Sequence, residues 1–184
     1  MASSRKKVLV RRFRPGGSTD VLAGYLPAGG FVRSRALDLL DLEGRTALIP
    51  LNDVKYVAYV KEFNLADTQS PERLTRRTFL ARPRTEGLWL RLSFTTGETL
   101  EGLAPTDLAL ADDLVNHAGL FLTPPDIRSN TQRLYIPRTS IAELTLIAVI
   151  TSPSRRKPPV ASSGSDDLQQ ALFDAELPPN ARPN

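Results

Sequence analysis

The residues of this 184-residue sequence best suited to chemistry are arginines, which gather in two segments. Residues 5–14 hold Arg and Lys without an acid, and residues 73–91 hold six Arg against Glu86 alone. A guanidinium binds phosphate through two parallel hydrogen bonds and stacks on aromatic rings, so arginines interleaved with aromatic residues are typical of nucleic-acid surfaces. The candidate anion site therefore consists of Arg76, Arg77, Phe79, Arg82, Arg84, Trp89, Arg11 and Arg12.

A second interpretation of the same arginines is structural. Those of the segment 76–84 lie in a connector between two strand-rich regions, where they would be solvated or would pair with Glu62, Glu72 and Glu86. Arginines held in such pairs would fix the connector and leave fewer donors for a ligand.

Composition excludes several classes of catalytic site. The chain has no Cys and one His, His117, which excludes thiol nucleophiles, disulfides, iron-sulfur clusters and the common zinc sites. It also has no phosphate-binding Gly-rich loop, G-x-S-x-G elbow or H-E-x-x-H motif. Glu98 and Glu101 are interpreted as a turn residue and an exposed strand residue. We therefore expect a non-enzymatic protein with no cofactor or metal.

The elements that must position the arginines are β-strands. Short apolar runs, several with period-two alternation, are separated by Gly, Pro and Asp turn signals, which predicts an all-β fold. The predicted strands are 8–13, 21–26, 36–42, 46–51 and 54–60, followed by 88–94, 99–104, 119–124, 132–137 and 142–150.

These strands form two series that resemble each other. Ile136-Pro137 lies 87 residues after Ile49-Pro50, and Gly102 occupies the same place in its series as Gly24. A strand, a glycine-bent strand and a proline-terminated strand suit a small curved barrel. The sequence thus predicts two tandem small barrels, with bounds 5–62 for the first barrel, 63–86 for the basic connector, 87–151 for the second barrel and 152–184 for a disordered tail with a short helix at 166–177.

The segment RLSFTTGETLEGLA at 91–104 resembles the opening of Sm-like barrels, in which a strand, a Gly-containing turn and an x-x-G-x-L strand follow one another. The resemblance implies an SH3-like or Sm-like fold over about residues 8–60 and 88–150. It does not imply RNA binding, since the Sm uridine-binding signature is absent after Gly102.

A closer resemblance is to an uncharacterised family of bacterial proteins found chiefly in acidobacteria-like genomes. It rests on the segments RRTFLARPRTEGLWLRL (76–92), LTPPD (122–126), NTQR (130–133) and IPR (136–138). The resemblance spans most of residues 8–152 and implies no activity.

Two short motifs suggest further ligands. Arg73 and Arg77 have the R-x-x-x-R spacing of the PilZ linker, which implies a cyclic-dinucleotide sensor, but no D/N-x-S-x-x-G strand follows. In the tail, QQALF is similar to the pentapeptide by which bacterial proteins dock on the sliding clamp, which makes Gln169, Leu172 and Phe173 candidates for partner docking.

Together these patterns favour a binding module for nucleic acid or another anionic polymer. The alternative is a protein-interaction scaffold that docks through the tail helix or an open strand edge, including with further copies of the chain. The sequence holds no apolar run long enough for a membrane-spanning helix and no signal peptide, so we expect a cytoplasmic protein without a membrane partner.

Overall fold

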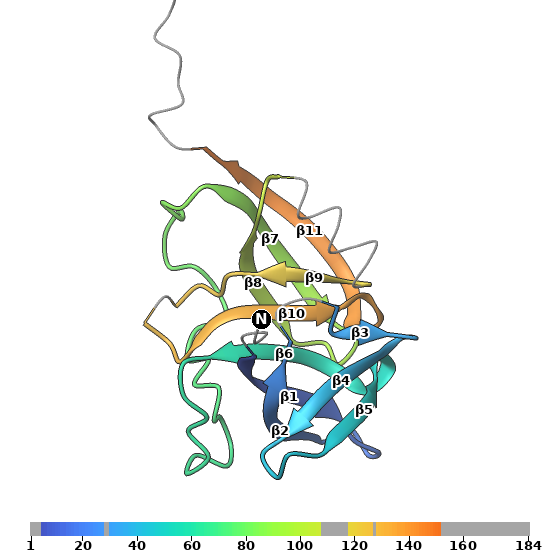
Figure 1. The fold of residues 1–184 in the computed structure, drawn as a ribbon. Helices are drawn as coiled ribbons and strands as arrows, with labels where there is room; N and C mark the ends of the chain where they lie inside the picture. Colours follow the sequence, from blue (N-terminus) through green and yellow to red (C-terminus); the bar gives the residue numbers. More distant parts are fainter. Residues whose placement is uncertain (1–4, 28–29, 108–117, 127, 152–184) are drawn as a thin grey trace, which may run out of the picture. The chain divides into compact units, whose positions relative to one another are not determined.

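A computed structural model describes residues 5–27, 30–107, 118–126 and 128–151. The fold over these residues is all-β, as predicted (Figure 1). The first series contains β1 (Lys6–Phe13), β2 (Thr19–Leu26), β3 (Val32–Arg33), β4 (Ala36–Asp41), β5 (Thr46–Pro50), the 3-10 helix η1 (Leu51–Asp53) and β6 (Val54–Val60). The second contains β7 (Gly87–Phe94), β8 (Thr99–Ala104), β9 (Gly119–Leu122), β10 (Thr131–Pro137), the 3-10 helix η2 (Arg138–Ser140) and β11 (Ile141–Ile150).

The strands form two antiparallel sheets. An eight-stranded sheet follows the order β3-β4-β2-β1-β6-β10-β9, with β5 added on β4, and curls into a half-barrel (Figure 1). A three-stranded sheet has the order β11-β7-β8. The larger sheet contains strands of both series, because β6 pairs with β10.

Each predicted strand has a counterpart, and β3 is the one strand among the described residues that the pattern did not indicate. It is only two residues long and pairs Val32 with Leu37 and Arg33 with Ala36. A ladder this short has no detectable period in the sequence.

The two proline turns match closely. Pro50 precedes η1 with φ −56° and ψ 135°, and Pro137 precedes η2 with φ −59° and ψ 141°. Proline lacks the N–H needed to continue a ladder, so each strand ends there and a single helical turn leads into the next strand. The Thr139 hydroxyl donates to the Leu51 carbonyl at 3.2 Å.

Both hydrophobic cores draw on both series. One contains Leu9 and Ala58 together with Leu92 and Leu134. The other contains an aromatic group in which the Phe31 ring lies 5.0 Å from that of Tyr135 and 5.9 Å from that of Phe121. Residues up to Thr151 accordingly form one compact unit.

Two further predictions concern membrane-spanning helices and the tail. None of the helices within the described ranges has the length and apolar character needed to cross a membrane. The predicted disordered tail at 152–184, with its helix at 166–177, lies outside the described residues.

Candidate anion-binding site

Arg11 on β1 is directed into the protein. It donates to Glu72 Oε1 through Nε at 3.0 Å and NH2 at 2.5 Å, to the Thr19 hydroxyl at 3.0 Å and to the Gln69 carbonyl at 3.1 Å. Its side chain is 15% exposed. Because Gln69 and Glu72 belong to the connector, Arg11 fastens the connector to β1.

Arg12 also binds a protein carboxylate. Its Nε and NH2 donate to the two oxygens of Asp20 at 3.2 and 2.7 Å, and Arg14 donates to the same group at 2.5 Å. Burial alone would raise the pKa of Asp20, but these two arginines lower it below its ordinary value. Arg11 and Arg12 therefore both bind protein carboxylates, in place of the anion expected for them.

Glu72 is the first anchor of the connector. The residue is 4% exposed, and its Oε1 accepts a 2.9 Å hydrogen bond from the Tyr56 hydroxyl in addition to those from Arg11. Burial, reinforced by the adjacent carboxylate, raises the pKa of Tyr56. The Thr131 hydroxyl donates to the Glu72 carbonyl at 2.8 Å. Glu72 is thus held by side chains from β1, β6 and β10.

Glu101 on β8 is the second anchor, and the expectation that it is exposed is wrong. The residue is 2% exposed and accepts from the Phe79 N–H at 2.9 Å, Trp89 Nε1 at 3.1 Å and Arg91 at 2.7 and 3.1 Å. Burial alone would raise its pKa, but these hydrogen bonds lower the pKa below its ordinary value. The Glu101 N–H also donates to the Arg77 carbonyl at 2.7 Å.

The NTQR segment supplies the third anchor. Asn130 Nδ2 donates to the Glu62 carbonyl at 2.7 Å and to the Pro71 carbonyl at 3.0 Å, while its Oδ1 accepts from the Glu62 N–H at 3.0 Å. An amide that donates and accepts in this way fixes the backbone at both places. The motif residue Asn130 therefore has a structural role.

The aromatic residues of the candidate site lie together. The rings of Phe79 and Trp89 are 5.6 Å apart at 74°, an edge-to-face arrangement, and both are partly exposed. The Trp89 N–H is directed to Glu101, so a ligand would reach these rings by stacking and not through that donor.

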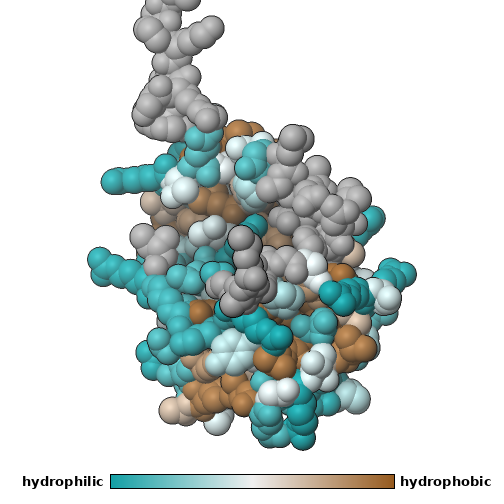
Figure 2. Space-filling view, viewed as in Figure 1, coloured by the Kyte–Doolittle hydropathy of each residue, from teal (hydrophilic) through white to brown (hydrophobic). Residues whose placement is uncertain are grey.

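Three connector arginines project into solvent. Arg76, Arg82 and Arg84 are exposed, and among the described residues none of the three makes a salt bridge. Pro83 between the last two is buried, which fixes the backbone while its neighbours face outward. Figure 2 shows hydrophilic side chains along the left of the view, where Figure 1 places the connector.

The two arginines with PilZ-like spacing make separate contacts. Arg73 donates to Asn64 Oδ1 at 2.8 Å. Arg77 lies 3.5 Å from Glu98 Oε2, and both of these side chains are 45% exposed. Glu98 also pairs with the buried Lys55, whose hydrogen bond is the main cause of the lowered pKa of Glu98.

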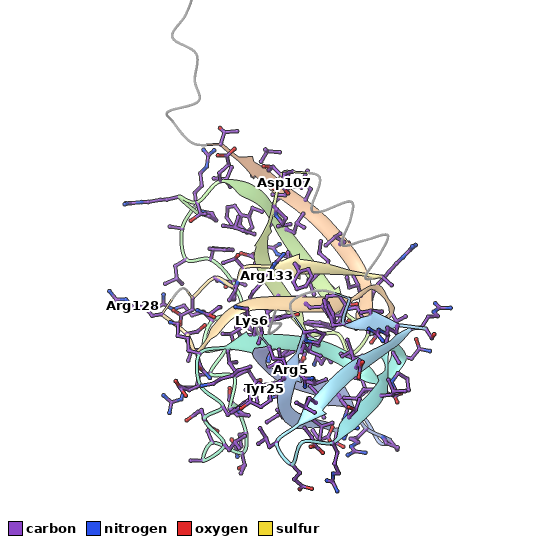
Figure 3. All side chains as sticks on the ribbon, in the orientation of Figure 1. Arg5, Lys6, Tyr25, Asp107, Arg128 and Arg133 are labelled. Atoms are coloured by element: carbon purple, nitrogen blue, oxygen red, sulfur yellow. The ribbon has the colours of Figure 1, made fainter. Side chains whose placement is uncertain are left out.

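A polar cleft of about 460 Å³ borders the first half of the connector. Its cations are Lys61, Arg73 and Arg128, and its carboxylates are Glu62 and Asp126. The Asp126 carboxylate accepts from the Thr75 hydroxyl at 2.6 Å and the Arg128 N–H at 3.0 Å, and the Thr75 bond is the main cause of its lowered pKa. Figure 3 shows Arg128 extending from the left of the view, on the connector side.

Two carboxylates expected to pair with connector arginines bind β1 instead: Glu72 pairs with Arg11, and Glu62 pairs with Lys7 at 3.2 Å. The described ranges contain no group of three or more His, Cys, Asp or Glu side chains placed to hold a metal ion. His117 and the docking candidates Gln169, Leu172 and Phe173 lie outside them.

The sequence model of a family of unknown function, DUF6982, matches residues 4–148. The chain belongs to this family. The match covers both strand series and the connector, as the resemblance to an uncharacterised family implied. Neither the curated proteins nor the solved structures include a match to this chain.

Proposed function

We propose that this DUF6982 protein is a non-enzymatic binding module that recognises nucleic acid through its connector. One observation carries the proposal: Arg76, Arg82 and Arg84 are exposed on a segment anchored by Glu101 and Asn130, and among the described residues none of the three makes a salt bridge. Exposed arginines attract the phosphates of a nucleic acid, and binding releases the cations that are condensed on that nucleic acid.

The anchors support this proposal by fixing the connector before a ligand arrives. Glu72 of the connector binds Arg11 of β1, while Glu101 and Asn130 bind connector backbone at Phe79 and Pro71. A segment ordered in advance loses less conformational entropy on binding than a mobile basic tail would. The arginines therefore sit on a scaffold that needs little rearrangement.

Two neighbouring features extend the surface. The polar cleft adds the cations Lys61, Arg73 and Arg128, which lie there with the carboxylates of Glu62 and Asp126. Phe79 and Trp89 keep partial exposure and offer ring surface for bases. The arginines would then contact phosphates while the two rings contact bases.

We also infer that the two strand series are related small barrels of the SH3-like or Sm-like kind. Their equivalent turns, with Pro50 before η1 and Pro137 before η2, support this inference. So does the position of Gly24 and Gly102 against the following strand of each series. Small barrels of this type leave strand edges and connecting segments as their binding surfaces.

The proposal is tested with the variant R76Q/R82Q/R84Q. We expect it to lose at least tenfold in affinity for a fluorescent single-stranded oligonucleotide, because each lost phosphate contact weakens electrostatic attraction at moderate salt. Fluorescence anisotropy measures the dissociation constant directly. Circular dichroism and urea unfolding should match the native protein, since these side chains are exposed.

The matched control is R33Q/R35Q/R45Q, which removes the same charge from exposed arginines on and near β3 to β5. Its affinity should stay close to that of the native protein. Equal losses in both variants would mean that net charge alone causes binding, and no binding by the native protein would exclude the proposal.

A second candidate function is protein interaction through a strand edge. It is favoured by β11, which exposes Leu144, Leu146 and Val149 to solvent. Apolar side chains on an open edge strand are unusual unless a partner covers them.

A further inference from the structure

The two series pair their strands in the same order. In the first, β6 pairs with β1, β1 with β2, β2 with β4 and β4 with β5. In the second, β11 pairs with β7, β7 with β8, and β9 with β10, while a bridge between Leu103 and Thr123 links β8 to β9. Setting aside the two-residue β3, each series places its last strand beside its first and its fourth strand at the far end.

The glycines make this correspondence close. A Cβ on Gly24 would lie 2.5 Å from the Leu40 carbonyl oxygen of β4, and a Cβ on Gly102 would lie 2.9 Å from Leu122 Cβ of β9. In both series the second strand therefore meets the third at its glycine. The strands of the two series therefore correspond in their contacts as well as in their order along the chain.

The series are joined by one antiparallel contact between unlike edges. The last strand of the first series, β6, pairs with the fourth strand of the second, β10. The paired residues are Tyr135 with Val57, Leu134 with Ala58, Arg133 with Tyr59 and Thr131 with Val60.

This contact uses one last strand and one fourth strand, so the other last strand and the other fourth strand each keep an unpaired edge. Within the described residues, the last strand of the second series, β11, pairs only with β7, and the fourth strand of the first, β5, pairs only with β4. The open strands also carry exposed apolar residues: Leu144 is 47% exposed, Leu146 is 54% exposed, and Leu48 on β5 is 68% exposed. Figure 2 shows hydrophobic side chains at the surface in the lower part of the view, where β4 and β5 lie in Figure 1.

We propose that β11 of one molecule pairs antiparallel with β5 of a second copy of this chain, repeating the contact between β6 and β10. The occupant is identified by the fold itself, since a last strand of this type already fits a fourth strand of this type within each molecule. Because β11 of one copy meets β5 of another, the contact is head-to-tail. Each added molecule therefore presents another open edge.

The internal contact also fixes the register. The 87-residue repeat that relates Pro50 to Pro137 relates β5 to β10 and β11 to β6. Shifting each paired residue by 87 gives the expected contacts between two copies. The pair Tyr135 with Val57 becomes Leu48 opposite Leu144, and the pair Arg133 with Tyr59 becomes Thr46 opposite Leu146. In this register Leu48 and Leu144 cover each other, and Leu146 packs against Thr46.

Backbone hydrogen bonds and apolar burial both favour this pairing. A ladder between the strands satisfies edge N–H and C=O groups that otherwise bind water, and Leu48 and Leu144 leave water together. Proline at the end of β5 limits the ladder there, as Pro137 does for β10.

Cysteine cross-linking tests the register, and the native chain contains no Cys to interfere. Full-length L48C and L144C proteins, mixed under mild oxidation, should form a disulfide-linked dimer. L48C mixed with L80C, whose site is 79% exposed but lies in the connector, is the control and should not. Cross-linking equal to this control, or preferential L144C–L144C dimers, would overturn the proposal.

Sedimentation velocity tests the head-to-tail arrangement. The native protein should form species larger than a monomer, and L48K and L144K should each be monomeric because each blocks one edge. A mixture of the two should form dimers and nothing larger, since L48K keeps an intact β11 and L144K an intact β5. L80K, as a control for folding and charge, should behave like the native protein. A monomeric native protein, or a mixture that stays monomeric, would contradict the inference.

Discussion

At the scale of single residues, the charged side chains around the connector are of two kinds, buried anchors and solvent-exposed arginines. Glu72 and Glu101 are buried and each accepts several donors, whereas Arg76, Arg82 and Arg84 are exposed. The division follows from burial, because a charge removed from water must be paired to remain stable. The anchors hold the connector, and the exposed arginines stay in contact with solvent.

Replacing Arg11 should destabilise the fold without affecting oligonucleotide binding. Arg11→Met leaves the Glu72 carboxylate buried without its counterion, which we expect to cost about 3 kcal/mol in the free energy of unfolding. Arg12→Met breaks a more exposed pair and should cost about 0.5 kcal/mol. Urea unfolding measures both, and a larger loss for Arg12→Met would contradict this assignment.

Glu101 should give the fold a pH dependence in the acid range. Because its folded pKa lies below its ordinary value, its ionised form adds stability that is fully present above the unfolded pKa and is lost as pH falls through the folded pKa. Glu101→Gln should unfold about 2 kcal/mol more easily at neutral pH, and this difference should shrink in acid as Glu101 becomes protonated. Unfolding at several pH values gives the comparison, and a difference independent of pH would disprove this role.

At the scale of elements, the sequence predicts the strands and their turns well. Gly24 and Gly102, Pro50 and Pro137, and the TTGE turn mark strand bends and ends through local chemistry that needs no knowledge of the rest of the fold. The anchors were missed because they join distant segments: Arg11 and Glu72 are 61 residues apart. Glu101 could have been found, since the TTGE hairpin register places it opposite Arg91.

Gly24 should be the least tolerant glycine of the first series. An added Cβ would meet the Leu40 carbonyl oxygen at 2.5 Å, and backbone cannot move aside cheaply. We expect Gly24→Ala to lower the free energy of unfolding by about 2 kcal/mol or more. Gly102→Ala should cost less, because its contacts are longer, 2.9 Å to Leu122 Cβ and 3.1 Å to the Thr123 carbonyl oxygen. Equal stability of Gly24→Ala and the native protein would show that β4 does not approach β2 so closely.

At the scale of the whole molecule, the connector and the two series depend on one another. The pairing of β6 with β10 draws both series into one sheet, and Glu72 contacts side chains from β1, β6 and β10 around the connector. The sequence predicts the series separately, but not this junction, because strand pairing across more than 70 residues depends on tertiary packing. The exposed arginines of the connector owe their fixed positions to that packing.

The most direct test of the central claim is the salt dependence of oligonucleotide affinity. For single strands the slope of log affinity against log salt is about 0.7 per phosphate contact, so losing three contacts should reduce its magnitude by about 2. We predict this reduction for R76Q/R82Q/R84Q and an unchanged slope for R33Q/R35Q/R45Q. A slope near zero for the native protein, or the same slope in the native protein and R76Q/R82Q/R84Q, would contradict the account.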